Sequence, residues 1–181
     1  MRLFAAVPLD DEARNYVRDV VSSLVRAGVE ARWVRQENWH ATLAFLGEVD
    51  SADVRRVRAT FVDAATRCGS FMLQLSTVGA FPNLRRPRVL FVGGESRQEA
   101  FASAAGIVRG AFEPLGFRFD DDAIAHVTVG RTRVARAIDP PAPLGRCEMR
   151  VNRLVLYCSA AEARGVRYDE IESVELGNPR M

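Results

Sequence analysis

The sequence predicts an α+β fold of two pseudo-symmetric lobes, each an antiparallel sheet with flanking helices, forming a central cleft. Short β-branched segments alternate with amphipathic helical segments along the 181 residues, as expected for sheets covered by helices. The order strand, helix, strand occurs twice, and the last strand of each set carries the motif His-x-Thr. With 48% hydrophobic residues, the chain is expected to form one domain over residues 1–181, built from two related lobes.

A fixed shift relates the two halves of the chain. The two histidines are 86 residues apart, and the same shift places residues 2–7 on residues 88–93, which are similarly apolar. It also places the helix expected from Asp10 on the helix expected from Ser96. A repeated strand, helix and motif strand therefore predicts two lobes that each contribute one histidine.

The first half is defined by clear start and stop signals. A strand over residues 2–7 is followed by a helix that begins near Asp10, where negative charge is favourable, and that Gly28 ends. The apolar stripe of this helix comprises Ala13, Tyr16, Val17, Val20, Val21, Leu24 and Val25. A short strand is expected over residues 32–34, and Ser51 is expected to cap the next helix.

The second half has corresponding signals. Ser96 and Glu99 fit a capping box at the start of a helix. Alternating or β-branched segments predict further strands over residues 71–78, 88–92, 149–159 and 167–176.

Both His-x-Thr motifs lie in segments with the composition of strands, where residues i and i+2 share a face. His40 and Thr42 therefore share one face, with Phe45 expected on the opposite side, and His126 and Thr128 share a face of the second strand. A single strand histidine most often has a structural role. Two copies with the same threonine offset, which include every histidine of the chain, favour a shared functional site.

Paired imidazoles suit general acid–base catalysis, because they titrate near ~6.5. A zinc site normally needs three or four ligands at short spacings. The sequence contains no His-x-x-x-His, and Cys68, Cys147 and Cys158 form no Cys-x-x-Cys. No Gly-x-Ser-x-Gly elbow indicates a serine nucleophile. The pattern favours metal-free catalysis without a cofactor, and the threonine hydroxyls suit the non-bridging oxygens of a phosphate.

The composition gives broader limits. The net charge is +2 and all 25 basic residues are arginine, so charge alone does not indicate nucleic acid, although arginine binds phosphate and stacks on bases. A loop at residues 79–87, with Arg88 beside it, is either a solvated turn or a phosphate-attracting rim. The aspartates at 120–122 either orient an imidazole or form a solvated loop. Three unpatterned cysteines, with no signal peptide or transmembrane run, predict a cytoplasmic protein.

The residues around the histidines resemble the two-histidine (2H) phosphoesterase superfamily. Within it, the chain is similar to the RNA 2′,3′-cyclic phosphodiesterases, often labelled 2′-5′ RNA ligases. Residues 38–48, Asn-Trp-His-Ala-Thr-Leu-Ala-Phe-Leu-Gly-Glu, are close to the family's first motif. Its opening strand and middle section are matched by residues 2–9, 79–83 and 87–90. Ala125 and Val129 depart from the usual proline and leucine or isoleucine, conservatively for strand structure.

The resemblance implies hydrolysis of a 2′,3′-cyclic phosphate end of RNA or a nucleotide to a 2′-phosphate. His126 would be the proton acceptor for the attacking water, and His40 the proton donor to the departing ribose 3′ oxygen. This direction comes from the resemblance, because spacing does not distinguish acid from base. Thr42 and Thr128 would hold the non-bridging oxygens as charge develops.

Family members use the positions five residues after each histidine around the nucleotide, here Phe45 and Arg131. Strict strand alternation directs both away from the histidine face. A bulge or strand end after Gly130 would turn Arg131 back, whereas core packing is the alternative for Phe45.

Other functions stay open at this point: 2′-5′ RNA ligation by the reverse reaction, a non-catalytic RNA-end-binding module, or hydrolysis of a small cyclic nucleotide. The chain has no lysine for an ATP-driven ligation, and the intact histidines and threonines favour an enzyme. We expect it to act as a monomer.

Overall fold

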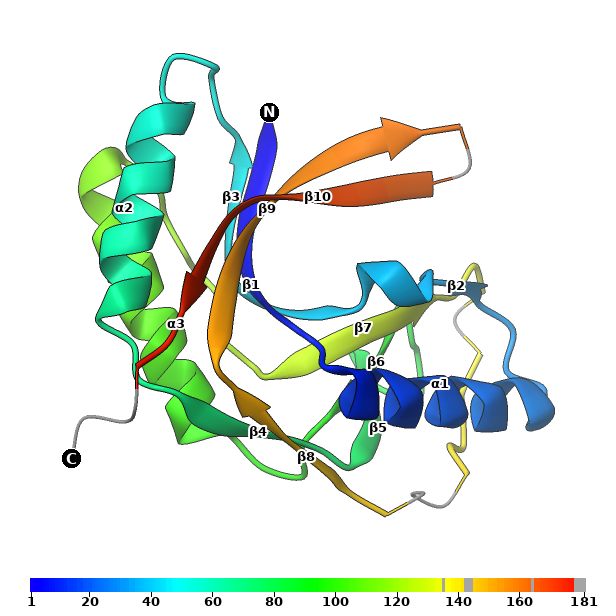
Figure 1. Ribbon diagram of the computed structural model, residues 1–181. Helices are drawn as coiled ribbons and strands as arrows, with labels where there is room; N and C mark the ends of the chain where they lie inside the picture. The colour runs from blue at the N-terminus through cyan, green and yellow to red at the C-terminus, as the bar shows by residue number, and fades with distance from the viewer. Residues whose placement is uncertain (135, 142–144, 164, 178–181) are drawn as a thin grey trace.

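The computed structural model describes residues 1–134, 136–141, 145–163 and 165–177 (Figure 1). Its strands are β1 (Arg2–Pro8), β2 (Arg32–Trp33), β3 (His40–Glu48), β4 (Phe71–Leu75), β5 (Thr77–Phe81), β6 (Val89–Gly93), β7 (His126–Arg131), β8 (Cys147–Val151), β9 (Arg153–Glu162) and β10 (Gly165–Glu175). Its helices are α1 (Asp11–Arg26), α2 (Val54–Thr66) and α3 (Glu99–Phe112), with 3-10 turns η1 (Gln36–Asn38) and η2 (Glu113–Leu115). Among these described residues, no helix has the length and apolar character needed to cross a membrane.

One antiparallel sheet runs through both halves, in the order β10-β9-β1-β3-β7-β6-β5, with β2 paired to β7. The two motif strands are neighbours at its centre, where Ala41 of β3 pairs with Val127 of β7. On one side β1 pairs with β3, and on the other β6 pairs with β7. The repeated strand, helix and motif strand expected from the 86-residue shift is therefore confirmed.

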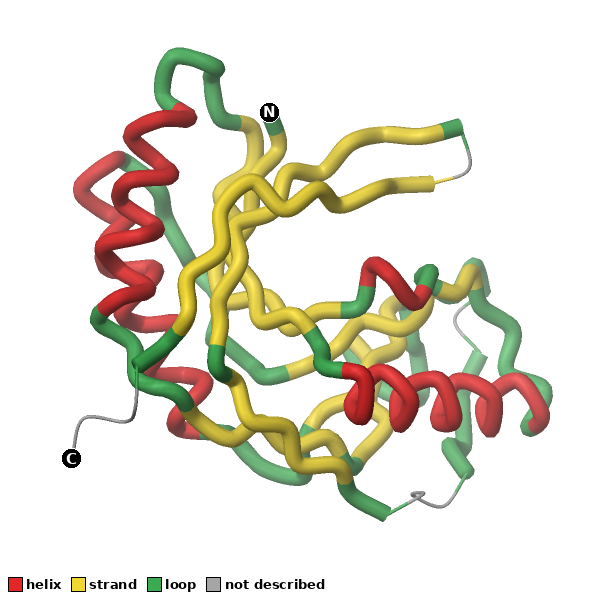
Figure 2. The backbone as a smooth tube through the Cα atoms, in the orientation of Figure 1, coloured by secondary structure: helices red, strands yellow, loops and turns green. Residues whose placement is uncertain are grey.

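The helices lie in two separate places around the sheets (Figures 1 and 2). Helices α2 and α3 pack together, α2 beside β10 and α3 beside β3, whereas α1 packs beside β8 of the small β4-β8 sheet. Most of each apolar stripe is buried, with Leu24, Phe61 and Phe112 all inaccessible to solvent. Val25, which was expected in the stripe of α1, is instead 51% exposed in the last turn of that helix. The predicted α+β class is confirmed.

The start and stop of α1 follow the sequence signals. The Asp10 carboxylate accepts a 2.8 Å hydrogen bond from the Ala13 N–H, and Gly28 beyond the helix end has a φ of 77°, in the left-handed region that glycine favours.

Both cap predictions for the later helices are wrong. Helix α2 follows Asp53 rather than Ser51, with no side-chain cap. Helix α3 follows Gln98 instead of beginning with a capping box at Ser96. The Gln98 side chain bonds the main-chain N–H and carbonyl of Gln74 at 2.6 and 3.0 Å, so it joins α3 to β4.

Two predicted strands are interrupted. The strand expected over residues 71–78 breaks at Ser76 into β4 and β5, which belong to different sheets. The strand expected over residues 149–159 breaks at Asn152 between β8 and β9 for the same reason. Strand β5 also extends to Phe81, so the loop expected from residue 79 begins later.

Candidate active site

The two motif strands present their His-x-Thr residues on one face. Around the central pair of Ala41 and Val127, both buried, the flanking histidines and threonines are half-buried. Side chains alternate along a strand, so His40, Thr42, His126 and Thr128 all project from the face opposite the core. The sheet therefore brings together the four residues that the motifs predicted.

A bulge in each motif strand changes the alternation at the same point. In β3 the register passes from Thr42 to Ala44, and in β7 from Thr128 to Gly130. Two successive residues are buried at each bulge, Leu43 with Ala44 and Val129 with Gly130. A bulge re-aims the residues that follow it.

The bulges turn the next side chain back to the histidine face. Phe45 is 48% exposed, so the alternative of core packing is wrong, and so is the opposite face that strict alternation gave it. Its ring lies under the Arg2 guanidinium, 4.9 Å from the ring centre. Arg131 is exposed on the same face as Thr128. This is the orientation that we expected if a bulge near Gly130 interrupted the alternation.

Arg109 of α3 holds the bulge of β3 in place. Its Nε donates to the Leu43 carbonyl at 2.8 Å, and its Nη1 donates to the Asp121 carbonyl at 2.6 Å. The guanidinium also lies 3.5 Å from the Asp121 carboxylate. The aspartate loop at residues 120–122 is thus tied to the motif strand rather than merely solvated.

Each imidazole is oriented by a main-chain carbonyl two residues before it. His40 Nδ1 lies 2.7 Å from the Asn38 carbonyl, and His126 Nδ1 lies 2.8 Å from the Ile124 carbonyl. A carbonyl only accepts, so Nδ1 carries the hydrogen in both rings and Nε2 is left for chemistry. His40 Nε2 lies 3.1 Å from the Thr42 hydroxyl.

Aromatic rings support both histidines in similar ways. His40 packs on Phe4, 4.8 Å between ring centres, and edge-on to Tyr168 at 5.2 Å. His126 packs edge-on to Phe81 at 5.1 Å and Phe91 at 5.3 Å. Each imidazole is therefore held both by aromatic packing and by the hydrogen bond at Nδ1.

Burial lowers the pKa of both imidazoles. The pKa of His40 falls to about 4, mainly through burial, with the nearby His126 lowering it further and the Asn38 carbonyl opposing the shift. Burial also lowers the pKa of His126, but the Ile124 carbonyl and the Asp121 carboxylate both oppose it. Both rings are neutral in the free protein at neutral pH, and His126 has the more favourable surroundings for a proton.

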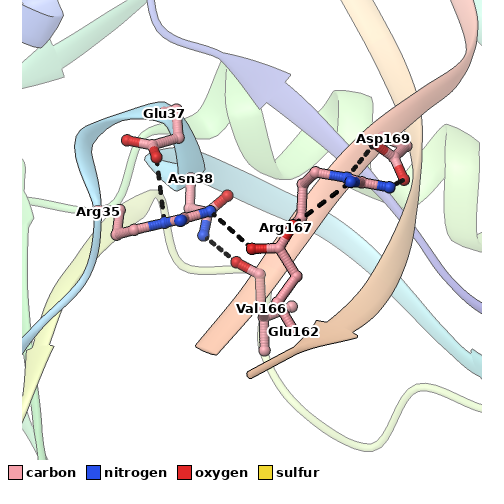
Figure 3. Close-up of polar contacts among 7 residues, drawn as sticks. All are labelled: Arg35, Glu37, Asn38, Glu162, Val166, Arg167 and Asp169. Atoms are coloured by element: carbon pink, nitrogen blue, oxygen red, sulfur yellow. Dashed lines mark hydrogen bonds and ion pairs between the residues drawn. The ribbon is translucent and has the colours of Figure 1, made fainter. Parts of the chain in front are cut away.

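Asn38, which orients His40, also contacts the long β9-β10 hairpin; Figure 3 shows the contact with the hairpin. The buried side-chain amide of Asn38 donates to the Val166 carbonyl of β10 at 2.6 Å, while its own carbonyl orients His40. Arg35 adds an ion pair to Glu162 of β9, at 3.5 Å. The hairpin is thus fastened beside the histidine.

A hollow of about 240 Å³ opens at this face. It is lined by Thr42, Phe45, Arg109, His126 and the segment from Arg118 to Ile124. The hollow reaches two of the four motif residues, Thr42 and His126.

Comparison with known proteins agrees with this geometry. The family model of LigT-like phosphoesterases matches residues 7–91. An RNA 2′,3′-cyclic phosphodiesterase of Methanothermobacter thermautotrophicus is 32% identical over 183 residues, covering 97% of this chain and 99% of the relative. The chain belongs to the LigT-like phosphoesterase family.

Solved structures of LigT-like phosphoesterases and related proteins share the whole fold. A crystal structure of a protein from Thermus thermophilus has a TM-score of 0.87 at 28% identity, covering 99% of this chain and 100% of that one. Escherichia coli LigT complexed with 3′-AMP has a TM-score of 0.82 at 26% identity, covering 97% of each chain.

Several residues of this LigT-like site were missed by sequence analysis. Phe4 and Phe91 are one position out of step in the repeat, because the 86-residue shift places Phe4 on Leu90, so the repeat did not reveal them. Tyr168, Asn38 and Arg109 reach the site through contacts distant in sequence, which no local pattern signals.

Proposed function

We propose that this chain is an RNA 2′,3′-cyclic phosphodiesterase, which hydrolyses a cyclic phosphate end of RNA or a nucleotide to a 2′-phosphate. The names of its relatives support this activity. The observation that carries the proposal is the matched orientation of two imidazoles on neighbouring strands, with Nδ1 of each held by a carbonyl. Such a pair can serve one phosphorus as base and acid.

In the proposed reaction, His126 Nε2 accepts a proton from water, and the water oxygen bonds to phosphorus. The bond from phosphorus to the ribose 3′ oxygen breaks, and His40 Nε2–H donates its proton to that oxygen. The Thr42 and Thr128 hydroxyls donate to the non-bridging oxygens, where negative charge develops. The step ends with His126 protonated and His40 neutral, and exchange with solvent restores both.

The surroundings of the histidines support this direction. Strong burial makes His40 a weak base, and therefore a strong acid once protonated, whereas the Asp121 carboxylate makes His126 the better base. The negative charge of the bound phosphate would favour the protonated form of His40. The proposed cycle routes no step through a metal.

The remaining assignments are part of the same proposal. Phe45 and Arg131, turned to the site face by the bulges, would contact the terminal nucleotide. Residues 1–181 would act as one domain of two related lobes, and as a monomer, because a single chain supplies both histidines. Free thiols at Cys68, Cys147 and Cys158 suit a reducing cytoplasm.

The test is incubation of a short RNA ending in a 2′,3′-cyclic phosphate with the wild type, His40→Ala and His126→Ala, each with and without EDTA. We expect a 2′-phosphate from the wild type, unchanged activity with EDTA, and a loss of about 10²-fold or more in each variant. A second RNA with a free 5′-hydroxyl reports ligation. A 3′-phosphate product, or activity that only added metal restores, would contradict the proposal.

A further inference from the structure

We infer that Arg32 is a second RNA-binding residue, which lies beside Arg131 and binds a phosphate of the RNA strand leading to the cyclic end. This inference rests on the proposed function and extends it from the terminal nucleotide to the body of the RNA. It begins from the pairing of β2 with the end of β7.

The two arginines are directly opposite each other on the site face. Arg32 pairs with Arg131, and the next pair is Trp33 with Gly130. Gly130 is buried, and a Cβ placed on it would lie 3.1 Å from the Trp33 ring, so this pair faces the core. Directly opposite residues share a face, so the exposed Arg32 and Arg131 side chains both project to the histidine side.

Their charges are not neutralised within the described part of the chain. Like charges opposite each other destabilise an antiparallel pair, yet neither arginine has an ion pair to a described carboxylate within 4.0 Å. The neighbouring Arg35 differs, since it lies 3.1 Å from Glu37 and 3.5 Å from Glu162. Two adjacent guanidinium groups without a described carboxylate partner are suited to an anionic ligand, and arginine binds phosphate bidentately.

The position of the pair indicates which phosphate it would bind. Arg131 follows His126 by five positions along β7, which is about 16 Å of strand. Arg131 and Arg32 therefore lie to one side of the phosphorus that the histidines face. Arg32 also borders the turn end of the β9-β10 hairpin, where a Cβ on Gly165 would be 3.6 Å from its Nη2. The arginines therefore lie on a route leading away from the histidines.

Arg32 also lines a groove of about 720 Å³. Its charged lining residues are Arg32, Arg133, Arg136, Glu30 and Asp139. The arginines outnumber the carboxylates, and Arg133 and Arg136 are exposed. A basic groove that follows the backbone is how proteins hold single-stranded nucleic acid, so the occupant we infer is a single RNA strand.

The experiment compares a 2′,3′-cyclic mononucleotide with an RNA oligomer that ends in the same nucleotide, using the wild type, Arg32→Ala and Arg32→Glu. We expect Arg32→Ala to lower kcat/KM for the oligomer about tenfold, the loss of one charge-assisted contact, and Arg32→Glu to lower it further. The mononucleotide should be hydrolysed at the wild-type rate by both variants. Arg55→Ala is the matched control, because it removes an exposed arginine on α2.

Direct binding separates this inference from the proposed activity. Fluorescence anisotropy with an RNA oligomer ending in a 3′-phosphate measures affinity without turnover. The slope of log affinity against log salt should fall by about 0.7 in Arg32→Ala, as for one single-strand phosphate contact. Unchanged binding and unchanged oligomer hydrolysis would overturn the inference, as would an equal loss on mononucleotide and oligomer. If the wild type cleaves neither substrate, the proposed function fails, and the binding arm still decides the role of Arg32.

Discussion

Gly79 lies beneath the ring that supports His126, so replacing it with alanine tests the architecture of the site without touching a catalytic group. Gly79 of β5 is paired with Phe91 of β6. A Cβ at residue 79 would lie 2.3 Å from Cζ and 2.5 Å from Cε2 of the Phe91 ring. Carbon atoms pack at about 3.5 Å or more, so the ring must move by roughly 1.2 Å.

That displacement reaches the histidine, because the space around the ring is limited. The Phe91 ring is 4.6 Å from Phe81 and 5.3 Å from His126, measured between centres. Overpacking of this kind costs about 1–3 kcal/mol of stability. A misplacement of about 1 Å at a catalytic group lowers the rate by up to about 10²-fold. We therefore expect Gly79→Ala to lower kcat by between about tenfold and 10²-fold.

The assay is kcat and KM for a cyclic phosphate substrate, with urea unfolding as the measure of stability. The control is Gly106→Ala, since a Cβ on this exposed glycine of α3 would meet nothing within 4 Å. This change should leave kcat unaltered and add up to about 1 kcal/mol of helix stability. In a Phe91→Leu background, Gly79→Ala should cost little, because the overlapping ring atoms are gone. Wild-type kcat in Gly79→Ala would refute the reasoning.

Three further predictions concern the histidine face. Asn38→Ala removes the amide that anchors Val166 but keeps the main-chain carbonyl that orients His40. It should lower stability by about 1–3 kcal/mol and lower kcat more than it changes KM. The control is Asn15→Ala at an exposed position of α1, and an unchanged kcat in Asn38→Ala would contradict this prediction. Because the pKa of His40 is lowered to about 4, the unfolded chain takes up a proton between about pH 6.5 and 4 that the folded protein does not. Stability should therefore fall across this window as the pH decreases, by an amount on the order of 3 kcal/mol; urea unfolding at pH 7 and pH 4.5 should show a smaller loss in His40→Asn, and equal losses would contradict the shift. Phe45→Ala should raise KM while changing stability by less than about 1 kcal/mol. A loss of stability of about 3–5 kcal/mol would instead indicate that this ring is packed in the core.

The sequence predicted the parts of the fold that local patterns encode. The 86-residue repeat correctly placed β1, α1 and β3 against β6, α3 and β7. The shared spacing of His40 with Thr42 and His126 with Thr128 correctly placed all four on one face, because alternation depends only on the backbone.

The sequence did not predict features that distant contacts determine. Alternation failed for Phe45, because a bulge held by Arg109, 66 residues away, shifts the side chains that follow Thr42. Asn38 is two residues before His40, but its partner Val166 is 128 residues away. The cap at Ser96 was wrong because the helix start is fixed by packing, as the contact of Gln98 with β4 shows; among the described residues, no corresponding contact explains the start of α2 after Asp53.

The central claim is that His40 and His126 act together on one phosphorus, and a double-mutant cycle tests it most directly. The measurement is the rate of cyclic phosphate hydrolysis by the wild type, His40→Ala, His126→Ala and the variant with both changes. Groups that act as a unit are strongly non-additive, so the double variant should be little slower than either single one. Losses that multiply, so that the double variant falls by the product of the two single effects, would contradict a shared acid–base reaction.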